Sequence, residues 1–198
     1  MYILSMIPLR TFTLLSSALA SLLIILVGGM IPSATFIIKS NLSLEVVDLP
    51  ISWQVPALIF TGLFCGPKAG MIAAIAYLTI GLFYLPVFQG GGSLGYIATP
   101  AFGYLAGFIP AVWVTGRMAQ LRRNNSMLRL FTTSISGLTI VHAVGIINIF
   151  AGALTSSWDK TLLELLYIYS ISNLPFHVLL CLPIVLLTKS LRKVLILE

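Results

Sequence analysis

The sequence predicts an all-α membrane protein with six transmembrane helices, on the basis of its composition, its apolar runs and its charge distribution. Hydrophobic residues make up 59% of the 198 positions and charged residues only 8%, whereas a soluble domain carries about 25% charged residues. No polar stretch is long enough to fold separately, so residues 1–198 are expected to form one integral membrane domain. The basic residues lie singly along the chain, which argues against nucleic acid as a partner despite the net charge of +6.

Six apolar runs come close to the roughly 20 residues that a helix needs to cross the hydrocarbon core of a membrane. The second and third runs are short and are joined by the turn Gly66-Pro67-Lys68. Proline is favoured at the first position of a helix, so Pro67 is expected to open the third span. The predicted spans are residues 11–30, 50–65, 67–85, 100–118, 128–153 and 174–189.

The charges support this count independently. With the amino terminus in the cytoplasm, six crossings place most basic residues inside, as the positive-inside rule requires, and leave only Lys39 and Lys160 outside. Four of the five acidic residues share the outer face: Glu45, Asp48, Asp159 and Glu164. Both termini are therefore predicted to be cytoplasmic, in a multi-pass protein of a bacterial-type plasma membrane surrounded by lipid. The inner basic residues are Arg10, Lys68, Arg117, Arg122, Arg123, Arg129, Lys189, Arg192 and Lys193.

Three outer segments are expected to meet, namely residues 31–49, 87–99 and 154–173. Residues 161–168 have the pattern of a short helix at the membrane interface, and the chain is expected to break at residues 170–173 before the last span. The middle segment contains three successive glycines and no charge. Such a segment does not hold a helix and needs protein or water around it, which favours a loop folded over a ligand.

The sequence lacks the motifs that commonly support chemistry. There is no GxxxxGK[ST] nucleotide-binding loop and no HExxH metal motif. Cys65 and Cys181 have no CxxC spacing, and a catalytic acid at membrane depth is missing because every acidic residue lies in a loop or at the chain end. We therefore expect no enzyme activity, no metal site and no cofactor.

Small residues in the first span recur at every fourth position, as Ser16 with Ala20 and Ser17 with Ser21. This spacing lets two helix backbones approach closely. It favours a helix contact within the bundle and leaves open a docking face for another membrane protein.

Several motifs in series resemble the BioY family. Their order and spacing also match, over about residues 49–108. The motifs are Leu49-Pro50-Ile51-Ser52-Trp53-Gln54, Cys65-Gly66-Pro67-Lys68-Ala69-Gly70, the run from Tyr77 to Leu85-Pro86-Val87-Phe88, glycines 90–92, and Thr99-Pro100-Ala101-Phe102-Gly103-Tyr104-Leu105-Ala106-Gly107-Phe108.

The resemblance implies a six-helix, biotin-binding S component of an energy-coupling factor (ECF) transporter, which captures biotin from the outer face of the membrane. It also implies a transmembrane coupling protein and a pair of cytoplasmic ATPases as partners. One motif departs from the family, in which many members open the last helix with a sequence like Pro-Gly-Asp-Leu-Leu-Lys, because this chain has Pro175-Phe176-His177-Val178-Leu179-Leu180. The acid and the lysine of that motif therefore do not carry over. An S component for another vitamin and a scaffold of cell-envelope assembly are the alternatives.

Biotin requires apolar walls, polar partners for its ureido group and a site for its carboxylate. The aromatic walls are expected from Trp53, Tyr77, Phe88, Tyr96 and Tyr104. Gln54, Asn173 and His177 are the predicted ureido partners, with His177 accepting from a ureido N–H group and a packing role as its alternative. For the carboxylate we favour the backbone amides of the turn formed by Gln89, Gly90, Gly91 and Gly92 over Lys39 or Lys160.

Overall fold

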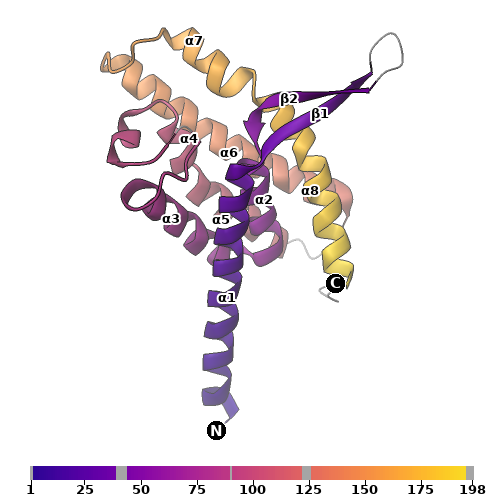
Figure 1. The fold of residues 1–198 in the computed structure, drawn as a ribbon. Coiled ribbons are helices and arrows are strands. Elements are labelled where there is room, and N and C mark those ends of the chain that lie inside the picture. Colours follow the sequence, from indigo (N-terminus) through magenta and orange to yellow (C-terminus); the bar gives the residue numbers. More distant parts are fainter. Residues whose placement is uncertain (1, 39–43, 90, 122–125, 195–198) are drawn as a thin grey trace.

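The structure is a computed structural model that describes residues 2–38, 44–89, 91–121 and 126–194, with the side chains of residues 9–33 and 51–194 within them. Within this part of the chain, helices cross the molecule from end to end and connecting elements gather at one end (Figure 1). The elements are α1 (Tyr2–Met30), β1 (Pro32–Ile38), β2 (Leu44–Ser52), α2 (Gln54–Cys65), α3 (Pro67–Phe83), the 3-10 turn η1 (Leu94–Ala98), α4 (Phe102–Ala106), α5 (Phe108–Leu121), α6 (Met127–Leu154), α7 (Leu162–Leu166), the π-helical turn η2 (Tyr167–Ile171) and α8 (Leu174–Val194).

The centre of the bundle is built from α2, α3 and α5. Helix α2 is apolar on all sides and nearly all of its residues are buried, as expected of a helix enclosed by others. Gly116 allows the close approach of α5 to the α2–α3 turn, since a Cβ there would lie 2.5 Å from the backbone nitrogen of Pro67. The largest fully buried side chains of this core include Leu58, Ile59, Leu63, Tyr77, Phe108 and Val112.

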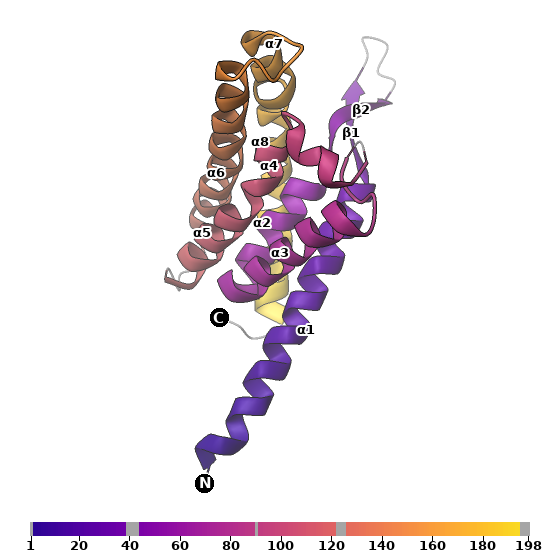
Figure 2. The ribbon, with the colours of Figure 1, turned by 90° about the vertical axis from the view of Figure 1, so that its left-hand side faces the viewer.

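Helix α1 lies on the outside of the bundle, and its amino-terminal part projects past the other helices (Figure 2). Leu15, Leu19, Leu23 and Val27 form an exposed apolar row at four-residue spacing. In a chain with three helical segments long and apolar enough to span a membrane, such a row is suited to contact lipid.

The two small-residue pairs of α1 lie on different sides of the helix. Ser21 is fully buried and Ser17 is partly buried, so this pair faces the packed interior. Ser16 and Ala20 are exposed. A docking role for another membrane protein remains a prediction for the exposed pair alone.

The helices correspond closely to the predicted spans, with α4 and α5 together forming the fourth. Three stretches have the length and hydropathy of spans, namely Leu9–Met30, Met127–Leu154 and Leu162–Val194, whereas α2 and α3 are shorter apolar helices. The beginning of α1 and the end of α8 lie at the same end of the bundle (Figures 1 and 2). The side of the membrane on which they lie stays a prediction.

The first outer segment is a β-hairpin, which the sequence analysis did not predict. Strands β1 and β2 pair antiparallel, with Pro32 opposite Ser52 and Ile38 opposite Leu44. Their β-branched residues favour a strand, but the run is short and lies beside strong helical runs. The predicted span 50–65 is corrected accordingly, because residues 50–52 belong to β2 and the helix begins only at Gln54.

The segment before the last span also differs from the prediction. Helix α7 begins where the interfacial helix was expected, with the Thr161 side chain accepting from the amide of Glu164. The first half of the expected break at residues 170–173 belongs to the π-helical turn η2, which is closed by the Ser172 amide donating to the Tyr167 carbonyl. This turn redirects the chain into α8 while keeping its backbone groups bonded (Figure 1).

The orientation in the membrane can be tested by cysteine labelling. In a protein whose Cys65 and Cys181 are replaced by alanine, Ser93→Cys and Ser126→Cys place exposed thiols in loops before η1 and before α6. A membrane-impermeant maleimide added to sealed, right-side-out vesicles should label position 93, whereas position 126 should react only after the vesicles are opened. Labelling of both positions from one side would contradict the six-span topology.

Candidate functional site

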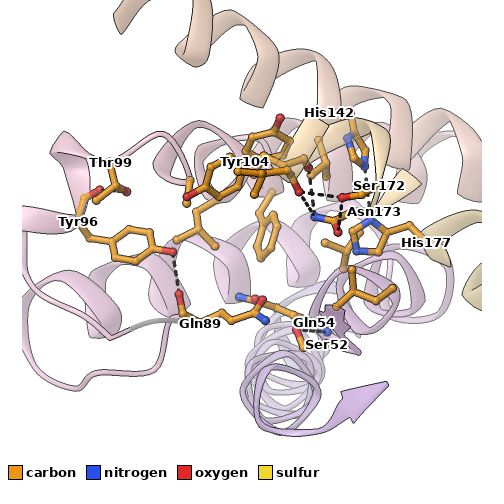
Figure 3. Close-up of a pocket in the computed structure, with 18 of the residues that line it drawn as sticks. Ser52, Gln54, Gln89, Tyr96, Thr99, Tyr104, His142, Ser172, Asn173 and His177 are labelled. Atoms are coloured by element: carbon orange, nitrogen blue, oxygen red, sulfur yellow. Dashed lines mark hydrogen bonds between the residues drawn. The ribbon is translucent and has the colours of Figure 1, made fainter. Parts of the chain in front are cut away.

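A cavity of about 540 Å³ lies near the end of the bundle that carries the hairpin, η1 and α7. Its volume falls within the approximately 300–1,000 Å³ typical of small-molecule sites. Segments far apart in the sequence form its wall (Figure 3). The apolar and aromatic lining residues are Ile51, Val55, Tyr96, Ala101, Tyr104, Leu105, Phe108, Val141, Tyr167, Ile168 and Tyr169, and the polar ones are Ser52, Gln54, Gln89, Thr99, His142, Ser172, Asn173 and His177.

More than half of the predicted ligand residues line this cavity. They come from the beginning of α2, the loop after α3, η1, α4 and the beginning of α8, and the structure arranges them around one cavity (Figure 3). Their contact with a ligand remains a prediction. These residues are Gln54, Gln89, Tyr96, Tyr104, Asn173 and His177.

Tyr77 and Phe88 lie behind the wall and are not among the lining residues. Tyr77 is fully buried, and its phenol donates to the Val87 carbonyl at 3.0 Å while it accepts from Nε2 of Gln54 at 2.5 Å. Phe88 packs against the rings of Tyr77 and Tyr96, at centroid distances of 5.4 and 4.9 Å. Both residues therefore hold lining residues in place. Trp53, another expected wall residue, is also absent from the lining.

Of the described residues of the glycine turn, Gln89 lines the cavity, whereas Gly91 and Gly92 do not. The Gly91 amide donates to the Phe88 carbonyl at 2.9 Å, which removes it as a free donor for an anion. Gly92 is packed against backbone, since a Cβ there would lie 2.6 Å from the Gly81 carbonyl oxygen. Gly90 lies outside the described residues. The structure thus favours a supporting role for this turn over the predicted anion site.

Neither lysine alternative for the carboxylate is part of the cavity as described. Lys160 is exposed and pairs with Glu164 at 3.5 Å on the surface of α7, and Lys39 lies outside the described residues. In the described part of the chain the cavity wall contains no Asp, Glu, Lys or Arg. The polar groups that the described wall offers to a ligand are neutral.

Gln89 and Tyr96 lie at the more exposed end of the cavity and are joined by a hydrogen bond. The Tyr96 phenol donates to the Gln89 carbonyl at 3.0 Å (Figure 3), which fixes the loop after α3 against η1. Burial, and secondarily the neighbouring Tyr169, raises the pKa of the Tyr96 phenol. The phenol therefore stays protonated over a wider pH range, and the bond to Gln89 persists.

The amides deeper in the cavity have their donors largely occupied. Asn173 donates through Nδ2 to the carbonyls of Ile168 and Tyr169. Gln54 donates through Nε2 to Tyr77, whose own proton is used on Val87. Carbonyl partners accept only, so these bonds fix the orientation of both amides. Gln54 keeps its oxygen and one N–H group for a ligand, whereas the Asn173 oxygen already accepts from Oγ of Ser172 at 3.4 Å and has one further lone pair.

Sequence reasoning missed His142 and Ser170 as parts of the site. His142 lines the cavity and contacts both Ser170 and His177, with distances of 3.2 Å from Nδ1 to Oγ and 3.4 Å between the imidazoles. The available signal was that the two histidines of this chain both lie within apolar spans. A polar side chain at membrane depth needs a polar partner, which favours pairing them. The other lining residues with a polar atom that sequence reasoning missed are Ser52, Thr99 and Ser172, together with the aromatic Tyr167 and Tyr169.

A model of the BioY family matches residues 9–196. A probable biotin transporter BioY from Lysinibacillus sphaericus is 31% identical over 120 residues, covering 58% of this chain and 61% of that protein. A biotin transporter BioY from Rhizobium etli is 29% identical over 146 residues, covering 70% and 73%. In the first match the chain spans less than two thirds of its relative.

The fold is also similar to a solved one. The crystal structure of an S-component for biotin from an ECF-type ABC transporter matches with a TM-score of 0.69, over 94% of this chain and 93% of that chain. At 21% identity, this likeness concerns the path of the chain and leaves the ligand contacts to be argued from the residues themselves.

Proposed function

The chain belongs to the BioY family, and from this premise we propose that it is the biotin-binding S component of an ECF-type transporter. The observation that carries the proposal is the cavity, which is apolar along its middle and polar at both ends. Biotin has the same distribution, since an apolar ring and chain separate its ureido group from its carboxylate. The family is a family of transporter components and not a class of enzymes, which agrees with a role in binding.

We place the ureido group at the end of the cavity formed by Gln54, Asn173 and His177. The oxygens of Gln54 and Asn173 are oriented to accept from the two ureido N–H groups, and an imidazole completes the set. The carboxylate then lies near Gln89 and Tyr96, where it keeps contact with water. This placement avoids burying an anion among described wall residues that include no Lys or Arg.

The outer face of a bacterial-type plasma membrane is the proposed side of capture, because the positive-inside rule assigns the end with the hairpin, η1 and α7 to that side. Movement of biotin across the membrane then requires a transmembrane coupling protein and a pair of cytoplasmic ATPases. The present chain contributes recognition, since its sequence has no nucleotide-binding loop.

Calorimetric titration of the purified protein tests this function. Biotin should bind at one site, and desthiobiotin, which keeps the ureido group, should bind as well. Lipoic acid has the same acid tail and no ureido group, so it should bind at least about tenfold more weakly, the equivalent of one lost hydrogen bond. Binding of thiamine or riboflavin in place of biotin would support the alternative of an S component for another vitamin.

Substitution of His177 should weaken biotin binding according to the hydrogen-bonding capacity that remains. His177→Leu removes a buried polar partner, which costs about 1–3 kcal/mol, or about tenfold to a hundredfold in affinity. His177→Gln keeps a donor and an acceptor and should bind more tightly than His177→Leu. Titration of both variants beside Leu179→Val, a change on the exposed face of α8, separates this role from packing. Equal affinity in the parent and His177→Leu would make His177 a packing residue only.

A further inference from the structure

Four polar side chains form a continuous row at the cavity, and three of them, Tyr104, His142 and His177, line it. The row starts at Tyr104, whose Oη lies 2.5 Å from Oγ of Ser170. It continues from Oγ of Ser170 to Nδ1 of His142 at 3.2 Å. From Nε2 of His142 it reaches Nδ1 of His177 at 3.4 Å (Figure 3). Ser170, His142 and His177 are 4%, 4% and 8% exposed, so protein surrounds the row. Its last atom, Nε2 of His177, has no protein partner among the described residues.

The row allows only two arrangements of protons. Each link needs one donor and one acceptor, and a neutral imidazole carries one of each. If Ser170 donates to Nδ1 of His142, then Nε2 of His142 donates to His177, and Nε2 of His177 carries a proton as well. If the direction is reversed, both histidines carry their proton on Nδ1. The two histidines must therefore share the same tautomer.

The surroundings of the cavity select between these directions. Both amides direct an N–H group to a protein acceptor. This orientation leaves the Gln54 oxygen, and the second lone pair of the Asn173 oxygen beside its contact with Oγ of Ser172 at 3.4 Å, as acceptors for a ligand. A cyclic urea also presents a carbonyl, and this carbonyl requires a donor. A third acceptor at Nε2 of His177 would leave the carbonyl to the second Nε2–H group of Gln54 alone, whereas Nε2–H of His177 gives it a donor from α8.

We propose that Tyr104, Ser170 and His142 form a hydrogen-bond relay that fixes His177 as an Nε2–H donor to the carbonyl of the ligand. The inference rests on the proposed function for the identity of that ligand, a cyclic urea. Ser170 and His142 are positioning residues, since they act through His177. The assigned role of His177 is the reverse of the sequence-based expectation, which made it an acceptor.

The position of Ser170 in the π-helical turn supports this assignment. A π turn widens the helix by one residue and is often found at functional sites. In this chain η2 (Tyr167–Ile171) contributes Tyr167, Ile168 and Tyr169 to the cavity lining while Ser170 is directed to Tyr104 and His142. One turn of the chain therefore supplies both the wall and the relay.

The tautomers are directly measurable because the chain has only two histidines. In protein labelled with ¹⁵N-histidine, two-bond proton–nitrogen correlations distinguish Nε2–H from Nδ1–H. Both histidines should be Nε2–H with and without biotin, so the result needs no residue assignment. One tautomer of each kind, two Nδ1–H forms, or a charged imidazolium at neutral pH would each overturn the relay. The ligand-free spectrum can be interpreted even if biotin proves not to be the ligand.

Variants of Ser170 test whether the relay acts on the ligand. Ser170→Ala should lower biotin affinity about tenfold, the equivalent of one buried hydrogen bond, and should release His142 from a single tautomer. Ser170→Thr keeps the hydroxyl and should restore both. Ser134→Ala is the matched control, because Ser134 is equally buried but bonds only within α6, to the Leu130 carbonyl.

A second ligand shows whether Ser170→Ala changes the hydrogen bond that His177 offers or weakens the binding of every ligand equally. 2-Iminobiotin in its protonated form has a donor where biotin has its carbonyl, so an Nε2–H of His177 disfavours it. The preference for biotin over 2-iminobiotin should fall about tenfold in Ser170→Ala. Equal loss of affinity for both ligands, or an unchanged affinity for biotin, would overturn the proposal. Absence of biotin binding in the parent protein would contradict the proposed function instead, while the tautomers would still decide the relay.

Discussion

Gly145→Ala should abolish measurable biotin binding. The ring of Tyr104 lies directly on Gly145, and a Cβ at this position would lie 2.5 Å from three atoms of that ring. The ring therefore has to move, which separates its Oη from Ser170 and displaces one wall of the cavity. Overpacking of this kind costs about 1–3 kcal/mol of stability, but the loss of binding should exceed this cost because two functions of Tyr104 fail together.

The comparison that isolates this effect uses the opposite face of the same helix. Ala143 is exposed on α6, so Ala143→Leu adds more volume than Gly145→Ala without entering the core. Titration and thermal unfolding of both variants should show lost binding only for Gly145→Ala. If that variant unfolds near the parent temperature and binds biotin as tightly as the parent, Tyr104 has no part in the site.

Gly92→Ala should weaken biotin binding by about a hundredfold, again through crowding. A Cβ on Gly92 would lie 2.6 Å from the Gly81 carbonyl oxygen, 2.7 Å from Cα of Pro86 and 2.8 Å from the Leu85 carbonyl oxygen. All three are backbone atoms that cannot rotate away, so the loop after α3 must shift at a cost of about 1–3 kcal/mol. The shift carries Gln89 with it, because Gln89 lies in this loop at the mouth of the cavity.

Two variants serve as controls for this prediction. Gly95→Ala adds the same methyl group three residues later, where the nearest atom is Oγ of Ser93 at an ordinary 3.5 Å. Lys160→Ala removes an exposed ion pair, which contributes little in water. Both should bind like the parent in the titration used for Gly92→Ala. Loss of binding in Lys160→Ala with the fold intact would move the carboxylate site to α7.

The helical spans were predictable from the sequence because lipid imposes a simple rule on them. A backbone in hydrocarbon must satisfy its own hydrogen bonds, so long apolar runs such as residues 128–153 become helices. The hairpin of β1 and β2 was not predictable in this way. It lies almost entirely in a segment between two predicted spans and overlaps the second span only at residues 50–52. Water competes for the backbone groups of such a segment, so hydropathy no longer selects one structure.

The residue types of the site were predictable from the sequence, but which residues line the cavity and which pack behind the lining was not. Gln54, Asn173 and His177 were recognisable as polar residues near the outer ends of helices, and all three line the cavity. Tyr77 and Tyr104 are both tyrosines in predicted spans and look alike in the sequence. In the fold only Tyr104 lines the cavity, whereas Tyr77 is buried behind the lining residues. This distinction depends on the packing of α3 against α2, which one sequence does not specify. The contact of His142 with Ser170 likewise depends on the π-helical turn η2, which the hydropathy pattern does not predict.

The shortness of α2 and α3 has a consequence for biogenesis. Helix α2 has 12 residues and α3 has 17, which correspond to about 18 and 26 Å at 1.5 Å per residue, less than the approximately 30 Å of a hydrocarbon core. Insertion into the membrane depends on the length and hydrophobicity of a segment. Because both helices are short, neither one alone is a strong stop-transfer or start-transfer signal. The tight turn at Gly66 and Pro67 joins them into one helical hairpin. We therefore expect the nascent chain to deliver the two helices to the bilayer together, as a single unit of translocation.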